Sequence, residues 1–275
     1  MATTSSTQIE WANIAPGKVI VATEHEVWLH TLTGVEDRFW EPMTGAGNIA
    51  TTYRLLDGAM AAAKLAVACD SRPPDLTYNR LVWQLAGAYQ ITHATPPGME
   101  KARQNFASAA NHSLSNWAAD KVQEETGHDQ LALLDIQSLG YRAADLVENI
   151  FPPAAKVLVD YFNRSVNDSN PIDCVGYTYA LERLSLGAKS EHIQTIEAML
   201  PPGVNATRCL RVHSSVGADA EHVEENVEII AELSSSERTR IVRACYETAL
   251  LIFSPPQNGY LSSRELEDKL KPFKL

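Results

Sequence analysis

The stretch Gln123-Glu-Glu-Thr-Gly-His-Asp129 combines a carboxylate and an imidazole within one expected helix. Glu125 and His128 are three residues apart, so on a helix their side chains share a face about one turn from each other. An apolar stripe continues along the same expected helix, through Leu131, Leu134 and Leu139. The pattern therefore predicts that Glu125 and His128 point toward neighbouring helices and not toward water.

Most of the chain outside this stretch repeats its apolar residues with the period of an amphipathic helix. The best candidate for a strand is the short run Lys18-Val-Ile-Val-Ala22, and residues 24–39 are expected to form one or two helices. We therefore expect an all-α fold, a single-domain bundle of about seven to nine helices whose faces are buried against one another.

No segment has a change of composition strong enough to mark a domain linker. Residues 1–15 are predicted to form a polar N-terminal arm, and residues 16–275 one helical domain. Within that domain, Pro96-Pro97 is expected to interrupt the chain after His93, because proline removes a helical hydrogen bond. A long helix over 100–139 should follow, with a break near Asn111.

The composition limits the classes of partner. Of the 275 residues, 45% are hydrophobic and 21% charged, as in ordinary globular proteins, and the net charge of −11 disfavours nucleic acids and anionic membranes as partners. No apolar run reaches the ~20 residues that cross a bilayer. The first residues show neither the basic flank nor the apolar run of a secretory signal, and the four cysteines form no CxxC pair. We therefore expect a cytoplasmic protein with reduced thiols.

Two further segments carry side chains of the metal-binding type. Glu182 lies among apolar and aromatic residues, with Tyr179 one turn before it. Asp219 and His222 are three apart and share a helix face, and His213 precedes them. Each of these residues taken alone is more simply explained as an exposed ion pair or a core histidine. Their joint order favours a metal site.

A carboxylate-bridged iron site in a helical bundle needs carboxylates and imidazoles from several helices. The sequence offers them as an E-x-x-H pair, a lone Glu and a D-x-x-H pair on separate expected helices. Carboxylates balance and bridge two cations, and imidazoles suit Fe(II) while leaving coordination positions open. Zinc is a less natural occupant, because its structural sites favour cysteine and its catalytic sites use few ligands.

The run from Trp117 to Leu233 resembles the haem-oxygenase-like di-iron oxidases and oxygenases, relatives of the TenA and PqqC helical fold. The resemblance rests on the spacing of 54 residues from His128 to Glu182 (182 − 128) and of 31 from Glu182 to His213 (213 − 182). It implies a haem-oxygenase-like fold and two Fe(II) ions per chain, of which the departures at Lys121 and His213 would leave the second labile. It also implies these metal ligands: Glu125, His128, Glu182, His213, Asp219 and His222.

Two positions depart from the family pattern. Lys121 stands where many members carry a carboxylate, which would leave one iron short of a ligand. His213 and Asp219 are six residues apart where the family has four, so His213 and His222 would face opposite sides of a regular helix. Either the helix is irregular near Gly217, which we favour, or His213 is not a ligand.

By the same resemblance the protein is an enzyme that activates O2 to oxidise a small substrate. The absence of a long Leu- and Phe-rich run favours an amino-acid-derived substrate, with desaturation, C–C cleavage, nitrile formation or N-oxygenation as the reaction. Lys121 is a candidate cation for a substrate carboxylate, and Tyr179 a candidate pocket residue. The electron donor must be external, since the chain contains no ferredoxin or flavin module. A homodimer is compatible with the sequence, although no surface stripe predicts one.

Three other functions stay open. The first is a metal-free TenA- or PqqC-like enzyme, either a cofactor-ring oxidase or a thiaminase-like hydrolase, the latter using Cys174 or Cys209 as its nucleophile. The second is a fatty-acid decarboxylating di-iron oxidase. The third is a helical scaffold whose acidic residues and histidines are merely exposed.

Overall fold

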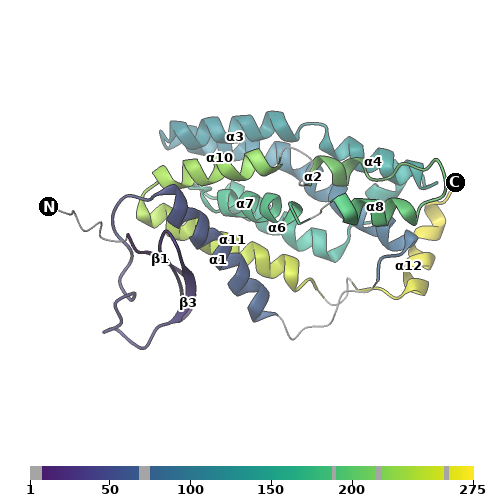
Figure 1. Cartoon of the computed structure of the whole chain (residues 1–275). Coiled ribbons are helices and arrows are strands. Elements are labelled where there is room, and N and C mark those ends of the chain that lie inside the picture. The colour runs from purple at the N-terminus through teal and green to yellow at the C-terminus, as the bar shows by residue number, and fades with distance from the viewer. Residues whose placement is uncertain (1–7, 68–74, 188–189, 215–218, 257–259) are drawn as a thin grey trace. The chain divides into compact units, whose positions relative to one another are not determined.

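The structure is a computed structural model that describes residues 8–67, 75–187, 190–214, 219–256 and 260–275 (Figure 1). It is mostly helical, as the sequence predicted, with a small antiparallel sheet near the N-terminus. The chain divides into two compact units. The sheet unit comprises Met1–Cys69, Ile172–Leu181 and Glu221–Phe253. The helical unit comprises Asp70–Pro171, Glu182–Ala220 and Ser254–Leu275.

The elements follow this division. The sheet unit contains β1 (Glu10–Ala15), β2 (Lys18–Ala22), β3 (Val27–Thr31), α1 (Ile49–Ala66), α11 (Ser235–Phe253) and most of α7 (Asp173–Ser185) and α10 (Asp219–Glu232). The helical unit contains α2 (Tyr78–Ser108), α3 (His112–Glu125), α4 (His128–Ser138), α5 (Ala143–Asn149), α6 (Pro153–Asn167), α8 (Ser190–Ala198), α9 (Arg208–Val212), α12 (Ser263–Leu270) and a short 3-10 helix (Lys271–Phe273).

The three strands form an antiparallel sheet in the order β1-β2-β3. The strand predicted at Lys18–Ala22 is confirmed with the same bounds. The prediction of a polar arm over residues 1–15 is wrong for residues 10–15, which form β1. Residues 1–7 of the predicted arm lie outside the described chain. Alternate β1 residues, Ala12 and Ile14 among them, are buried, and this two-residue period is the signal of a half-buried strand.

The prediction of one or two helices within residues 24–39 is also wrong, since β3 lies there and pairs with β2. Val19 and Val21 of β2 pack with Phe39, which follows β3 along the chain, on one face of the sheet. On the other face, Gly58 of α1 lies so close to Ile20 that a side chain at Gly58 would clash with it. Figure 1 shows the purple strands beside α1 and α11, which contact them.

Helix α2 runs without a break through Pro96 and Pro97, against the interruption that the sequence predicted. A proline inside a helix costs about 3 kcal/mol, so packing must outweigh that penalty here. α2 contacts α3, α4 and α6, and its Gly98 presses directly against the Phe162 ring of α6. The local proline signal is therefore overridden by burial along the central helix of the helical unit.

The long helix predicted over residues 100–139 is broken at two places. The expected break at Asn111 is confirmed, and the Asn111 side chain caps α3 by accepting a hydrogen bond from the Leu114 backbone N–H at 3.2 Å. The second break, at Thr126-Gly127, separates α3 from α4. Because of such breaks, the helices of the described chain are shorter than we predicted, and they outnumber the expected seven to nine.

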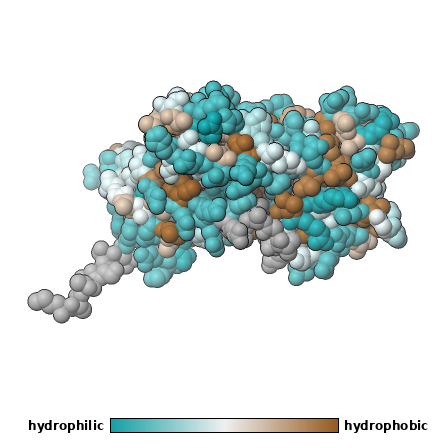
Figure 2. Space-filling model, turned by 90° about the horizontal axis from the view of Figure 1, so that it is seen from above, coloured by the Kyte–Doolittle hydropathy of each residue, from teal (hydrophilic) through white to brown (hydrophobic). Residues whose placement is uncertain are grey.

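One face of the molecule is largely polar (Figure 2). Figure 2 shows a face on which hydrophilic residues predominate and hydrophobic ones form small, scattered groups. Among the helices in the described ranges, none combines the length and the apolar character that a membrane crossing requires.

Candidate metal centre

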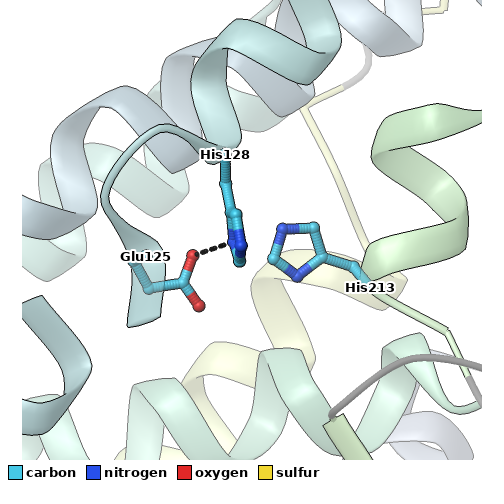
Figure 3. Close-up of side chains that lie close together, drawn as sticks. All are labelled: Glu125, His128 and His213. Atoms are coloured by element: carbon cyan, nitrogen blue, oxygen red, sulfur yellow. Dashed lines mark hydrogen bonds and ion pairs between the residues drawn. The ribbon is translucent and has the colours of Figure 1, made fainter. Parts of the chain in front are cut away.

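Three side chains from three helix ends converge within the helical unit (Figure 3). Glu125 is the last residue of α3, His128 is the first residue of α4, and His213 caps the C-terminus of α9. Each offers a ligand atom, and these atoms all lie within 4.8 Å of one another. We call Glu125, His128 and His213 the triad.

The triad is partly shielded from water. The Glu125 Oε2 and His128 Nδ1 atoms are 3.0 Å apart, and these two side chains are 13% and 21% exposed. The His128 and His213 rings meet edge to face with their centroids 4.7 Å apart. The Nε2 atom of His213 is buried. The triad is therefore neither fully exposed nor fully buried.

Gly127 explains how Glu125 and His128 meet although they belong to different helices. Its φ of +93° lies in the left-handed region that glycine adopts without strain, and the chain turns there between α3 and α4. The sequence predicted the same meeting by a different route, as a pair on one continuous helix. The pairing is confirmed, but a turn produces it.

The short helix α9 is fixed to α4 by the buried carboxylate of Asp135, which is 0% exposed. Asp135 accepts hydrogen bonds from the Cys209 backbone N–H and from Arg208 Nη1, both at 2.9 Å. Burial raises the pKa of Asp135, and these two hydrogen bonds oppose the rise. Since α4 begins at His128 and His213 directly follows α9, Asp135 connects the two helices that carry these members of the triad. Sequence reasoning missed this residue.

Lys121 is buried in α3, one turn before Glu125. Its ammonium Nζ lies 2.8 Å from Glu124 Oε2 and 3.1 Å from Glu182 Oε1. Burial is the largest influence on the pKa of Lys121 and lowers it, but the charges of Glu182 and Glu124 more than compensate and the pKa is raised. The structure thus brings Glu182 to Lys121. Glu124, which the sequence analysis did not assign, was recognisable as a partner by its position three residues after Lys121.

Tyr179 belongs to the sheet unit, where its hydroxyl donates a hydrogen bond to Asp57 Oδ1 at 3.0 Å. It is fully buried, and burial together with the charge of Asp57 raises its pKa. Its predicted place in the pocket wall stays a prediction.

Asp219 and His222 were predicted ligands on one helix with His213. Instead, α9 ends at Val212 with His213 as its C-cap, and α10 begins at Asp219. The irregularity expected near Gly217 falls on residues outside the described chain, as does the Asp219 side chain. His222 belongs to the sheet unit and is half-buried. The ligand roles of Asp219 and His222 therefore stay predictions.

The donor set of the triad fits one metal ion. Two imidazoles and one carboxylate form the set that holds non-haem Fe(II) in many oxygenases, with further positions left open. Metal–ligand bonds of about 2.1 Å place neighbouring ligand atoms ~3 Å apart, so binding would draw the three groups somewhat closer.

The chain is similar in structure to a domain of unknown function with a haem oxygenase-like fold from Shewanella denitrificans OS217. The TM-score is 0.57 at 19% sequence identity, over 82% of this chain and 89% of that one. The chain has a haem-oxygenase-like fold.

The chain is also similar in structure to a TenA homolog from Pseudomonas syringae pv. tomato str. DC3000. That comparison has a TM-score of 0.56 and 15% identity, over 78% of this chain and 96% of the homolog. No family model and no curated protein matches the sequence. The two structural similarities confirm the haem-oxygenase-like fold that the sequence resemblance implied.

Proposed function

We propose that this haem-oxygenase-like protein is an O2-dependent, non-haem iron oxidoreductase that binds Fe(II) through Glu125, His128 and His213. The observation that supports the proposal is the convergence of two imidazoles and one carboxylate from three helix ends. Side chains that serve only to cap or pack helix ends have no need to meet at one point.

Each member of the triad has a separate task in this proposal. Glu125 supplies the negative charge that offsets part of the charge of the ion, and His128 and His213 supply neutral nitrogen ligands. Bound Fe(II) would provide the electrons that start the reduction of O2, and an external donor would restore them. The substrate is a small molecule, and we retain an amino-acid derivative as the expected class.

The same donor set also occurs in catalytic zinc sites, so the identity of the metal needs a direct test. Carboxylate and imidazole ligands without cysteine suit Fe(II), and the sequence resemblance to di-iron oxidases favours iron as well. The resemblance further implies a second iron.

A metal-free enzyme of the TenA type is the second candidate, because the chain shares its fold with a TenA homolog. A thiaminase-like hydrolase needs a reactive thiolate. Cys174, Cys209 and Cys245 are all buried, and burial raises the pKa of Cys209 to about 12 and those of Cys174 and Cys245 as well. A buried, protonated thiol is a poor nucleophile, so Cys174 and Cys209 do not favour this alternative.

Anaerobic titration of the metal-free protein with Fe(II) tests the proposal. We expect His128→Ala and His213→Ala each to weaken binding by at least ~100-fold, more than the loss of an outer-shell partner. His192→Ala is the matched control, since His192 is exposed on α8 of the same unit. Failure of the unmodified protein to bind Fe(II) more tightly than the two variants would refute the proposal.

The reaction is tested by stopped-flow absorbance of the iron-loaded protein mixed with O2 and candidate amino acids or fatty acids. A transient visible band, or O2 consumption, that requires one substrate class identifies that class. Iron binding without O2 consumption under any of these conditions would contradict the oxidoreductase assignment while leaving the metal site intact.

A further inference from the structure

The buried ammonium of Lys121 lies beside the proposed metal centre. Lys121 is 2% exposed, and lysine is almost never buried unless it is paired. Its partners are Glu124, 2.8 Å away, and Glu182, 3.1 Å away, and Glu182 is itself 7% exposed. A buried cation paired with two carboxylates therefore lies in this part of the helical unit.

The position of Lys121 on α3 places this cluster next to the triad. Lys121 and Glu125 are four residues apart in the same helix, so their side chains share a face. Glu125 is a member of the triad, whereas Glu182 is the lone glutamate that the sequence predicted as a ligand. Thus the ammonium is held by one predicted metal ligand and stands one helical turn from another.

We propose that the Lys121 ammonium takes the place of a second metal ion, so that the chain holds one ion at the triad and none at Glu182. This inference rests on the proposed iron site. A metal ion bound to Glu182 at ~2.1 Å would stand within a few ångströms of Nζ, where two positive charges in a poorly solvated site repel each other strongly.

Charge balance supports the same conclusion. Among the described side chains of the triad and of the Lys121 contacts, Glu124, Glu125 and Glu182 carry three negative charges, which together neutralise one divalent ion and one ammonium. Two divalent ions beside the same ammonium would leave an excess of positive charge among partly buried groups, which is unfavourable. The di-iron occupancy implied by the sequence resemblance is therefore replaced by a pair made of one metal ion and one ammonium. In this arrangement Lys121 is committed to carboxylates of the chain and not to a substrate carboxylate.

Metal stoichiometry and electron paramagnetic resonance test the proposal without reference to activity. The metal-free protein is loaded anaerobically with Fe(II) or with Mn(II), and unbound metal is removed. We expect about one ion per chain, and for Mn(II) the hyperfine-split signal of an isolated ion. Lys121→Glu should raise the content to about two ions per chain, with the broadened signal of a coupled Mn(II) pair.

Lys101→Glu makes the same change of charge on the exposed surface of α2 and should leave the stoichiometry at one. Lys121→Met removes the charge at similar volume and provides a second variant should Lys121→Glu fail to fold. Two ions in the unmodified protein would overturn the inference, as would a single ion in every Lys121 variant that folds. Either result would leave the proposed iron site standing. Absence of metal from the unmodified protein would instead refute the proposed function.

Discussion

The sheet unit and the helical unit each gather charged side chains, but with different degrees of closure. In the sheet unit, Arg238 is 1% exposed and donates to Glu10 Oε1 at 3.1 Å, while the Thr51 hydroxyl donates to Glu10 Oε2 at 2.9 Å. In the helical unit, Glu125 and His128 remain 13% and 21% exposed. The buried cluster of the sheet unit is closed to solvent, whereas the triad at the helix ends is partly accessible.

The largest expected effect comes from opening the closed cluster. Glu10→Ala should lower the free energy of unfolding by about 3–5 kcal/mol, because it leaves the buried Arg238 charge without its carboxylate. Metal binding should not change. Urea denaturation with and without metal measures both. Asp160→Ala, which removes the exposed ion pair with Lys156, should cost less than ~1 kcal/mol. A loss for Glu10→Ala no larger than this control would contradict the comparison.

A smaller effect is expected from loosening the frame of the open site. Asp135→Asn turns an amide N–H₂ toward the Cys209 N–H or toward Arg208, so one hydrogen bond is lost in a buried position. We expect metal affinity to fall by ~10–100-fold, as when an outer-shell partner is removed. Isothermal titration with Fe(II) measures this. The matched control is Asp145→Asn in the exposed pair with Arg142, and equal affinities of the two variants would exclude a positioning role for Asp135.

The smallest effect is expected at the turn between α3 and α4. Gly127→Ala forces a Cβ into a left-handed conformation and should cost about 1–2 kcal/mol. No other atom lies within 4 Å of such a Cβ, so the penalty is one of backbone conformation. Gly17, in the β1–β2 turn, also has a positive φ, of +71°, and equally open surroundings, so Gly17→Ala is the matched control. Both variants should lose similar stability in thermal unfolding, but only Gly127→Ala should also weaken metal binding. A matching loss of affinity in Gly17→Ala would contradict this.

The sequence predicted the helical class, the strand β2 and the break at Asn111, because each depends on local pattern or capping. It did not predict β1, although alternate burial of Ala12 and Ile14 follows a two-residue period that was readable. It also placed a break at Pro96-Pro97. There the contacts of α2 with three other helices decide the outcome, and tertiary packing of this kind is not visible in a local signal.

The site was predicted in part for a similar reason. Glu125, His128 and His213 were named from their residue types and order, and the structure brings them together. The spacing argument against His213 assumed one regular helix, whereas α9 ends with that residue as its C-cap. Asp135 was not recognised, because nothing in its local sequence shows that it binds the start of a helix more than 70 residues away. Long-range partners of buried carboxylates are set by the fold and not by neighbouring residues.

The placement of the triad at helix ends has a consequence for local unfolding. Helix ends fray before helix centres, and amide hydrogens there exchange with solvent through small openings. A metal ion that bound Glu125, His128 and His213 would tie the end of α3, the start of α4 and the end of α9 to one another. Metal loading should therefore slow hydrogen exchange at these three termini first, well before it affects the middle of α2.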